Sequence, residues 1–399
     1  MKSIILLLVA AVLSLITSAQ TNITDSIVHQ TYQRKFMVHL PPNFTNTTQR
    51  ALVVNLHGGS GNMVSAQGFS QMNPVADENN FVVAWPQGYG VALPGFSWAD
   101  GRNTSADQAG IDDVGFIDKL IDTLINRYNI NSNKIYICGF SNGGFMVQRL
   151  ACQLTGRFAA MASLGSSMDT VLHQNCNPVK PVPIAFFNGT ADPAMPYTGG
   201  PMQNPQVIPV VPVDTTVQFW VTHNNCQTAL AVVDIPDTFT TDNSTAQLYN
   251  YTNCDCNADV AFYKLIDGGH TWPGVYVPSQ AGVLGNTNRD INASIALWDF
   301  FNAHSLCSDV NSLTELTKNT ITLYPNPAQN TLNINLSQAP TDNINVQVLN
   351  PLGQVVNTAI FDKSAGQKLT IDIGNLPAGI YFVKINMGNG VKTLRLIKE

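Results

Sequence analysis

Residues 134–144 read Lys134-Ile135-Tyr136-Ile137-Cys138-Gly139-Phe140-Ser141-Asn142-Gly143-Gly144. A short apolar run ends in Gly-Phe-Ser-Asn-Gly, and the apolar residues that follow, up to Gly156, recur at helical spacing. The stretch therefore predicts a strand, a tight turn and a helix N-terminus in succession. Glycine lies two residues before and two after Ser141, which keeps the neighbouring backbone away from the hydroxyl. The strand before it and the helix after it favour a nucleophile elbow over a chance Gly-x-Ser-x-Gly match.

Strand and helix patterns alternate on both sides of this stretch. Upstream, an apolar run ends at His57-Gly58-Gly59-Ser60-Gly61, another ends at Pro86, and residues 114–125 form one face of an amphipathic helix. Downstream, residues 161–165, 183–187 and 260–266 predict strands, and residues 215–223 and 291–304 predict helices. This alternation predicts a mostly parallel sheet with helices on both faces, in one α/β domain over residues 20–308.

The pattern changes after residue 320. Short alternating segments rich in β-branched residues follow one another, separated by Asn-Pro, Pro-Leu-Gly and Pro-Ala-Gly turns. They predict a small all-β sandwich over residues 321–399, joined to the first domain by a polar linker at 309–320. The segments are residues 321–324, 331–336, 344–349, 369–373 and 380–385.

The N-terminus has the layout of a secretory signal peptide, residues 1–19. Lys2 precedes an apolar run at 4–16, and Thr17-Ser18-Ala19 provides small residues for cleavage. The run is too short to cross a bilayer, and no later segment has the required length, so we expect an exported protein with no integral membrane segment. With 12% charged residues, a net charge of −6 and no basic cluster, nucleic acid is a poor candidate as a partner.

Seven cysteines in an exported chain indicate disulfides, and the odd number leaves at least one thiol unpaired in a monomer. Cys138, on the strand before Ser141, is the predicted free and buried thiol. The other six allow up to three bridges, and their spacing leaves the connectivity open. They are Cys152, Cys176, Cys226, Cys254, Cys256 and Cys307.

A serine nucleophile needs a base to take its proton and an acid to orient that base. In chain order the acid and then the histidine should follow the serine, each at the end of a later strand. Of the histidines after Ser141, His270 alone directly follows a predicted strand, on a Gly-Gly loop, and Asp192 lies just past the strand at 183–187. We therefore predict a catalytic triad of Ser141, Asp192 and His270.

Two backbone donors should stabilise the oxyanion. We expect one to be the N–H of Asn142 and the other to be that of Gly59, because glycine lets the backbone approach a substrate. Trp98 and Trp272 are candidates for an aromatic wall that binds the acyl group, with ordinary packing as the alternative. The sequence predicts no cofactor and no metal, since Asp112-Asp113 before a helix is explained by the helix dipole.

With these residues in place, the chain over residues 32–304 resembles the secreted esterases of the polyhydroxybutyrate-depolymerase and feruloyl-esterase family of α/β-hydrolases. The resemblance implies the same triad. It also implies bridges from Cys152 to Cys176 and from Cys226 to Cys254, which leave Cys256 and Cys307 as a possible third pair. The segments that carry it are residues 56–59, 85–88, 112–116, 139–144, 188–193 and 268–274.

The C-terminal module is similar to the type A sorting domain of the type IX secretion system of Bacteroidetes. Leu323-Tyr324-Pro325-Asn326-Pro327 and Gly379-Ile380-Tyr381-Phe382-Val383 carry this likeness. It implies that the secretion machinery is a partner, and that the protein is released outside the cell or attached to its surface.

We thus expect a secreted serine ester hydrolase that works through an acyl-enzyme and cleaves feruloyl or acetyl esters of plant cell-wall polysaccharide. The alternative is an extracellular depolymerase of poly(3-hydroxybutyrate) or another aliphatic polyester. A hypothesis from another class is a catalytically dead, surface-bound carbohydrate-binding protein. An intact triad would argue against this last reading.

Overall fold

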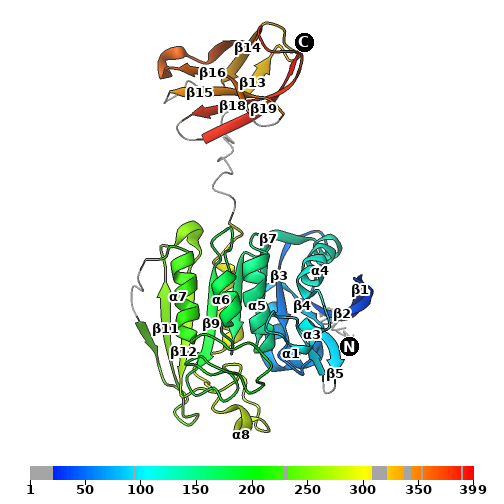
Figure 1. The fold of residues 1–399 in the computed structure, drawn as a ribbon, viewed down its shortest axis with the longest axis vertical. Helices are drawn as coiled ribbons and strands as arrows, with labels where there is room; N and C mark the ends of the chain where they lie inside the picture. Colours follow the sequence, from blue (N-terminus) through cyan, green and yellow to red (C-terminus); the bar gives the residue numbers. More distant parts are fainter. Residues whose placement is uncertain are drawn as a thin grey trace, which may run out of the picture. The chain divides into compact units, whose positions relative to one another are not determined.

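The computed structural model describes residues 21–92, 95–227, 232–307, 321–336, 343–351, 354–387 and 390–399. The predicted signal peptide at 1–19 and the predicted linker at 309–320 lie outside these ranges. The chain divides into two compact units, with the boundary between Cys307 and Ser308. Both units are drawn in Figure 1.

The first unit is built on a ten-stranded sheet in the order β1-β2-β4-β3-β7-β8-β9-β12-β11-β10. The strands from β4 to β12 are parallel, and antiparallel strands extend both edges. The bounds are β1 Thr21–His29, β2 Tyr32–Leu40, β3 Arg50–Leu56, β4 Val82–Pro86, β7 Ile130–Phe140, β8 Ala160–Leu164, β9 Ile184–Gly189, β10 Val232–Ile235, β11 Thr245–Tyr251 and β12 Val260–Ile266, with a separate hairpin of β5 Tyr89–Ala92 and β6 Gly95–Ser97.

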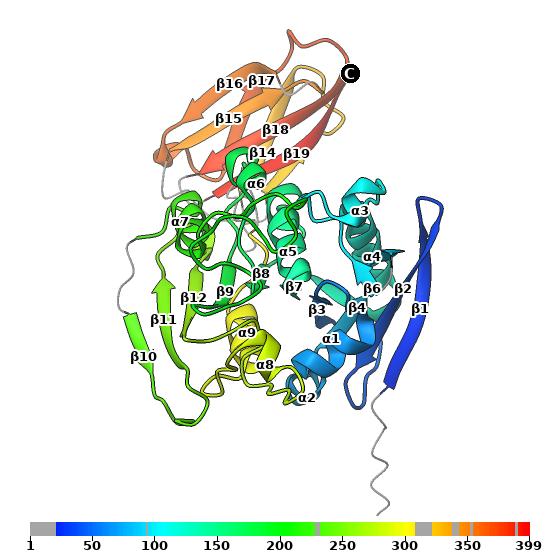
Figure 2. The same cartoon turned by 60° about the horizontal axis from the view of Figure 1, so that its bottom comes forward.

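Helices cover both faces of this sheet. Helices α4, α5 and α7 lie over one face, and α1, α2 and α9 lie over the other (Figure 2). Their apolar side chains belong to two separate cores. Central strands such as β8 and β9 are therefore buried along their whole length. The bounds are α1 Met63–Ser70, α2 Met72–Asn79, α3 Ser105–Gln108, α4 Asp113–Tyr128, α5 Asn142–Gln153, α6 Thr170–Asn175, α7 Val213–His223, α8 Ala281–Leu284 and α9 Ala293–Asn302.

The strand order changes direction between β3 and β7. After β3 the chain first forms β4 on one side, and it then returns to place β7 on the other side. The loops that leave the carboxyl ends of β3 and β7 therefore diverge, and such a switch point is where open α/β sheets bind ligands. The His57-Gly58-Gly59 loop follows β3, and Ser141 follows β7.

The second unit is a sandwich of two antiparallel sheets, β13-β14-β17 and β16-β15-β18-β19. Buried residues alternate with more exposed ones along β15 and β17, as expected when one face of each sheet packs on a shared core. The predicted fold class, an α/β domain followed by an all-β sandwich, is confirmed. The bounds are β13 Ile321–Tyr324, β14 Thr331–Leu336, β15 Ile344–Leu349, β16 Val355–Phe361, β17 Lys368–Asp372, β18 Gly379–Met387 and β19 Gly390–Lys398.

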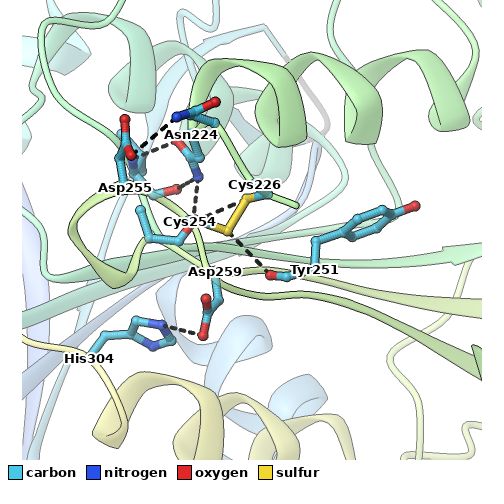
Figure 3. The surroundings of a disulfide bond; sticks show 10 residues. Asn224, Cys226, Tyr251, Cys254, Asp255, Asp259 and His304 are labelled. Carbon is cyan, nitrogen blue, oxygen red and sulfur yellow. Dashed lines mark hydrogen bonds and ion pairs between the residues drawn. A yellow bond between two sulfur atoms is a disulfide. The ribbon is translucent and has the colours of Figure 1, made fainter. Parts of the chain in front are cut away.

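Three disulfides join Cys152 to Cys176, Cys226 to Cys254 and Cys256 to Cys307, while Cys138 is free and buried. Both pairings implied by the resemblance, and the third pair that they leave, are confirmed. The second bridge fastens the loop after α7 to the loop before β12 (Figure 3). Beside it, the Nδ2 of Asn224 donates to the carbonyl of Ala258 at 2.8 Å, and the N–H of Asp255 donates to the carbonyl of Asn224 at 2.9 Å.

Within the described ranges, no helix combines the length and the apolar character that crossing a membrane would require.

The Cys256–Cys307 bridge spans 51 residues, more than either of the others. Because a bridge over a long loop restricts the unfolded chain most, replacing both cysteines by serine should lower the free energy of unfolding by about 4 kcal/mol. Denaturant titration followed by tryptophan fluorescence measures the change. Cys138→Ala is the matched control, since it removes a buried thiol that closes no loop and should cost only about 1 kcal/mol. Equal losses in the two variants would contradict the prediction.

Candidate active site

Ser141 lies at the sharp turn between β7 and α5, with φ 55° and ψ −120°. A non-glycine residue at positive φ is strained, and the turn is held from both sides. The N–H of Ser141 donates to the carbonyl of Leu164 at 2.8 Å, and its own carbonyl accepts from the N–H of Phe145 at 2.9 Å. The surrounding contacts thus maintain a strained backbone that presents the hydroxyl at the end of the strand.

Both glycines of the motif are required by close backbone approach. A Cβ at position 139 would lie 2.3 Å from the carbonyl oxygen of Gly143. A Cβ at position 143 would lie 2.5 Å from the carbonyl oxygen of Leu56, at the end of β3. The first turn of α5 therefore packs directly on β3, which brings the loop after β3 next to Ser141.

His270 and Asp192 form a buried pair on the loops after β12 and β9. The Nδ1 of His270 donates to Oδ2 of Asp192 at 2.7 Å. The other carboxylate oxygen of Asp192 accepts the N–H groups of Ala194 and Met195, both at 2.8 Å. This arrangement fixes the imidazole ring and leaves its Nε2 free of the carboxylate, as a general base requires.

The glycines of these two loops let them lie against each other. The N–H of Ala191 donates to the carbonyl of Gly268 at 3.0 Å. A Cβ at Gly189 would lie 2.1 Å from the same carbonyl oxygen. His270 and Ser141 share the walls of two cavities. The structure thus brings the three predicted residues to one place, while proton transfer between Ser141 and His270 stays a prediction.

The two expected oxyanion donors lie on neighbouring backbone segments. The N–H groups of Ser60 and Gly61 donate to the carbonyls of Phe96 and Gly58. That of Gly59 makes no such bond to any residue in the described part of the chain. Asn142 is the first residue of α5, where backbone N–H groups have no partner within the helix. A Cβ at Gly59 would lie 3.6 Å from that of Asn142, so both N–H groups border the same space.

Trp98 does not lie where the sequence analysis placed it. Its side chain is 0% exposed and does not line either cavity at Ser141. Its Nε1 donates to the carbonyl of His57 at 2.9 Å, and its backbone N–H donates to Oδ1 of Asn142 at 2.7 Å. The prediction that Trp98 binds substrate is therefore corrected: it is a packing residue that supports the loop after β3 from behind.

The Asn142 side chain also hydrogen-bonds to a buried ion pair, Asp100 with Arg102. Its Nδ2 donates to Oδ2 of Asp100 at 2.6 Å, and the same oxygen accepts from Nη2 of Arg102 at 2.6 Å. Burial raises the pKa of the Asp100 carboxyl, and the charge of Arg102 opposes that rise. The Arg102 guanidinium also lies over the Phe145 ring, 3.4 Å from its centroid. The loop that carries Arg102 is thus fastened to the start of α5.

One cavity at Ser141, of about 510 Å³, carries the rings of Phe69, Phe140 and Trp272 on its wall, among loop glycines and several polar side chains. The Phe69 and Phe140 centroids are 4.9 Å apart, and each lies about 6.5 Å from Trp272 (6.4 and 6.5 Å). The Nε1 of Trp272 donates to Oγ of Ser294 at 3.2 Å, so the ring has a fixed position on the wall. This position agrees with the predicted place of Trp272, whose role in binding stays a prediction.

A second cavity, of about 540 Å³, meets the first at Ser141 and His270 and lies on the α5 side. Its walls carry hydrogen-bonding side chains in addition to the apolar Phe145, Met195, Met202 and Val207. Those side chains are Arg102, Asn103, Thr104, Gln108, Gln203, Asn204 and Gln206. Of the two cavities that flank Ser141, the first therefore presents more aromatic surface and the second more hydrogen-bonding side chains.

His57 has a structural role in the loop after β3. Its Nδ1 donates to the carbonyl of Gly58 at 2.7 Å, and its Nε2 accepts from the N–H of Gly88 at 2.9 Å. Burial lowers the pKa of His57 to about 4. A neutral imidazole with both nitrogens engaged cannot act as a base at neutral pH, but it can fix the loop that contains Gly59.

The two acidic residues before α4 have separate structural partners. Asp112 caps the helix by accepting from the N–H of Gly115 at 2.9 Å. Asp113 accepts from Nη2 of Arg34 at 2.5 Å and from the N–H of Ala99 at 2.7 Å. Across the described ranges, no group of three or more His, Cys, Asp or Glu side chains is arranged to hold a metal ion.

The sequence analysis missed the contribution of Phe69 and Arg102. Phe69 belongs to α1, a short helix whose apolar residues do not gather on one face, so they form no clear helical pattern in the sequence. Arg102 follows Trp98 in a loop without a regular element, so only the fold brings it to α5. The signal that could have suggested α1 is the Asn62 to Ser65 capping box, which the structure contains.

Comparison with known proteins matches the two units of the chain to different families. Residues 322–399 match the family of the secretion system C-terminal sorting domain. The predicted sorting domain is therefore confirmed. Residues 67–178 match the prolyl oligopeptidase family. This second match includes Ser141 but ends before Asp192 and His270.

Among curated relatives, a Nocardia uniformis subsp. tsuyamanensis protein named as an esterase, NocK, is 25% identical over 67% of this chain and 78% of its own length. Feruloyl esterase B of Piromyces equi is 28% identical over 59% of this chain, which spans only 42% of that protein. Among solved structures, an acetyl xylan esterase from Aspergillus awamori covers 66% of this chain and 97% of its own, with 15% identity and a TM-score of 0.43.

The depressed pKa of His57 predicts a pH dependence of stability. Its ordinary value is 6.5 and the folded value is about 4, so below pH 6.5 the unfolded chain binds a proton that the folded chain excludes. The stabilisation is fully present above pH 6.5 and is lost as the pH falls through 4, by about 3 kcal/mol.

Urea unfolding between pH 7 and pH 4 measures this loss. His57→Gln should be less stable at pH 7 and should lose less stability on acidification than the wild type. His173→Gln, which changes a histidine on α6, serves as the control and should keep the wild-type slope. The same slope in His57→Gln as in the wild type would refute the assignment.

Proposed function

We propose that this chain, an exported carboxylic ester hydrolase with an α/β-hydrolase fold and a C-terminal sorting domain, uses Ser141, His270 and Asp192 to cleave feruloyl esters of plant cell-wall polysaccharide. The protein acts outside the cell or at its surface. The observation that carries the substrate assignment is the pair of cavities that meet at Ser141, one aromatic and one polar.

The chemistry follows from the geometry of the site. His270, held by Asp192 through Nδ1, takes the proton of the Ser141 hydroxyl at Nε2 while Oγ attacks the ester carbonyl carbon. The N–H groups of Gly59 and Asn142 stabilise the oxyanion, with the N-terminal end of α5 adding a favourable dipole. His270 then gives the proton to the departing alcohol oxygen. Water repeats the sequence on the acyl-enzyme and releases the acid.

The aromatic cavity suits the acyl half of a feruloyl ester. Its volume of about 510 Å³ far exceeds what an acetyl group would fill, and aromatic rings prefer the tilted packing that Phe69, Phe140 and Trp272 offer. The polar cavity, with its amides and Arg102, suits the hydroxyl groups of a sugar. The similarity to feruloyl esterase B of Piromyces equi supports the same assignment.

An aliphatic polyester fits this pair of cavities less well. Such a polymer presents the same apolar chain on both sides of the scissile bond, whereas the α5 side of Ser141 is lined with hydrogen-bonding groups. Some of these groups already bond within the protein, as Asn103 does to Gln206 and Gln203 does to Pro193, but an aliphatic chain would bury their remaining hydrogen-bonding capacity unused. Polyester depolymerisation is the alternative, and parallel hydrolysis of the candidate substrates decides between the two.

The proposed triad predicts the effect of two substitutions. Ser141→Ala should lower kcat on an aryl ester by at least about 10³-fold. Asp192→Asn should lower it by about 10⁴-fold, because the His270 imidazole would no longer be held in the tautomer that a general base requires. A fluorophosphonate probe should label the wild type and should not label Ser141→Ala. Matching thermal unfolding curves establish that both variants fold. If folded wild-type protein is not labelled, the chain is a binding protein on an inactive hydrolase fold.

The substrate is decided by hydrolysis of methyl ferulate, acetylated xylan and a poly(3-hydroxybutyrate) film in parallel, with Ser141→Ala as the blank. We expect ferulic acid to be released with a kcat/KM at least about tenfold above that for release of acetate or 3-hydroxybutyrate. Acetate release without ferulate release would shift the assignment to acetyl esters. Erosion of the film with little aryl-ester hydrolysis would identify a polyester depolymerase, and the triad would still stand.

A further inference from the structure

A buried amide that the mechanism does not use lines the aromatic cavity. Asn55 lies near the end of β3, is 1% exposed, and lines this cavity. It pairs in register with Cys138 of β7, on the sheet face that also carries the core of α1, α2 and α9. Asn55 therefore lies below Ser141 on the same side of the sheet as Phe69 and Trp272.

Among the described residues, the Nδ2 of Asn55 has no hydrogen-bond partner. Other polar side chains on this wall have partners: His57 is engaged at both nitrogens, and Trp272 donates to Ser294. Buried polar groups are nearly always paired, so a buried amide without a partner calls for an explanation. Ligand pockets contain such groups, because a few polar atoms in an apolar cavity fix the orientation of the ligand.

The position of Asn55 matches the length of the proposed acyl group. Asn55 is level with Cys138, and Ser141 follows three residues later, so at about 3.3 Å per residue the two positions are about 10 Å apart along the strands. A hydroxycinnamoyl group measures about 8 Å from its carbonyl carbon to the para oxygen, from bond lengths of about 1.3 to 1.5 Å, and a hydrogen bond adds about 3 Å. With the carbonyl at Ser141, the far end of the ring reaches Asn55.

We propose that Asn55 is a specificity-determining residue that hydrogen-bonds the para-hydroxyl of a hydroxycinnamoyl group bound in the aromatic cavity. The amide can donate through Nδ2 and accept through Oδ1, and a phenolic hydroxyl can do both. This inference rests on the proposed function, since it assumes that the acyl group occupies this cavity. It adds that the enzyme selects hydroxylated rings over unsubstituted ones.

Hydrolysis of methyl 4-hydroxycinnamate and methyl cinnamate by the full chain tests the proposal. The two esters differ only in the para-hydroxyl. The wild type should prefer the hydroxylated ester by at least about tenfold in kcat/KM, because a site with an unpaired polar group discriminates against a ligand that cannot pair with it. Asn55→Leu, which replaces the amide by an apolar side chain of similar volume, should bring the ratio to about one. The loss of preference should come mainly from slower hydrolysis of the hydroxylated ester.

Asn345→Leu in the second unit is the matched control, since it also removes a buried amide oxygen that has no partner among the described residues. It should keep the wild-type ratio. A wild-type ratio near one, as expected if a buried water satisfies Asn55, would overturn the inference while the feruloyl esterase assignment stands. A wild-type preference that persists in Asn55→Leu would overturn it as well. No hydrolysis of either ester would instead count against the proposed function. The wild-type ratio is informative even if Asn55→Leu does not fold.

Discussion

The packing of the first turn of α5 on the end of β3 is the contact on which the site depends. At Gly143 the backbone of α5 approaches the carbonyl of Leu56 so closely that no side chain fits between them. This contact joins the two loops that leave the switch point of the sheet. It places Ser141, the first N–H of the helix and the N–H of Gly59 around one point, and it maintains the positive φ of Ser141. The predicted nucleophile and the predicted oxyanion donors are therefore consequences of one backbone arrangement.

A buried polar network keeps that arrangement rigid. His57 bonds Gly88, Trp98 bonds the carbonyl of His57, and Asn142 bonds both Trp98 and Asp100. Each of these groups is buried, so leaving any one of them unpaired would cost roughly 1–3 kcal/mol. The network therefore favours a single position of the loop after β3. Fixed donors are what oxyanion stabilisation requires, because they need no reorganisation when charge develops.

The sequence predicted those parts of the structure that depend on local pattern. The central strands are continuous apolar runs because both sheet faces are covered, and Asp192 and His270 could be found because each follows such a run. The edge strands β10 and β11 were missed, since exposed residues such as Val232 and Val233 give no buried pattern. Trp98 was misplaced because its burial depends on His57 and Asn142, which are distant in the chain. In the same way Asn55 looks like an ordinary residue of a buried strand, and only the fold leaves its amide without a partner.

The two cavities owe their different chemistry to the two faces of the sheet. The aromatic cavity opens beside α1, where the core of α1, α2 and α9 continues to the carboxyl ends of β3 and β7. The polar cavity lies on the α5 side and is built from loops, namely the segment around Arg102 and the residues after Asp192. Loops expose polar side chains, whereas a covered sheet face exposes apolar ones. In the proposed mode of binding, an ester whose carbonyl lies at Ser141 extends one half beside α1 and the other among the loops, which favours a substrate with two unlike halves over a uniform polymer.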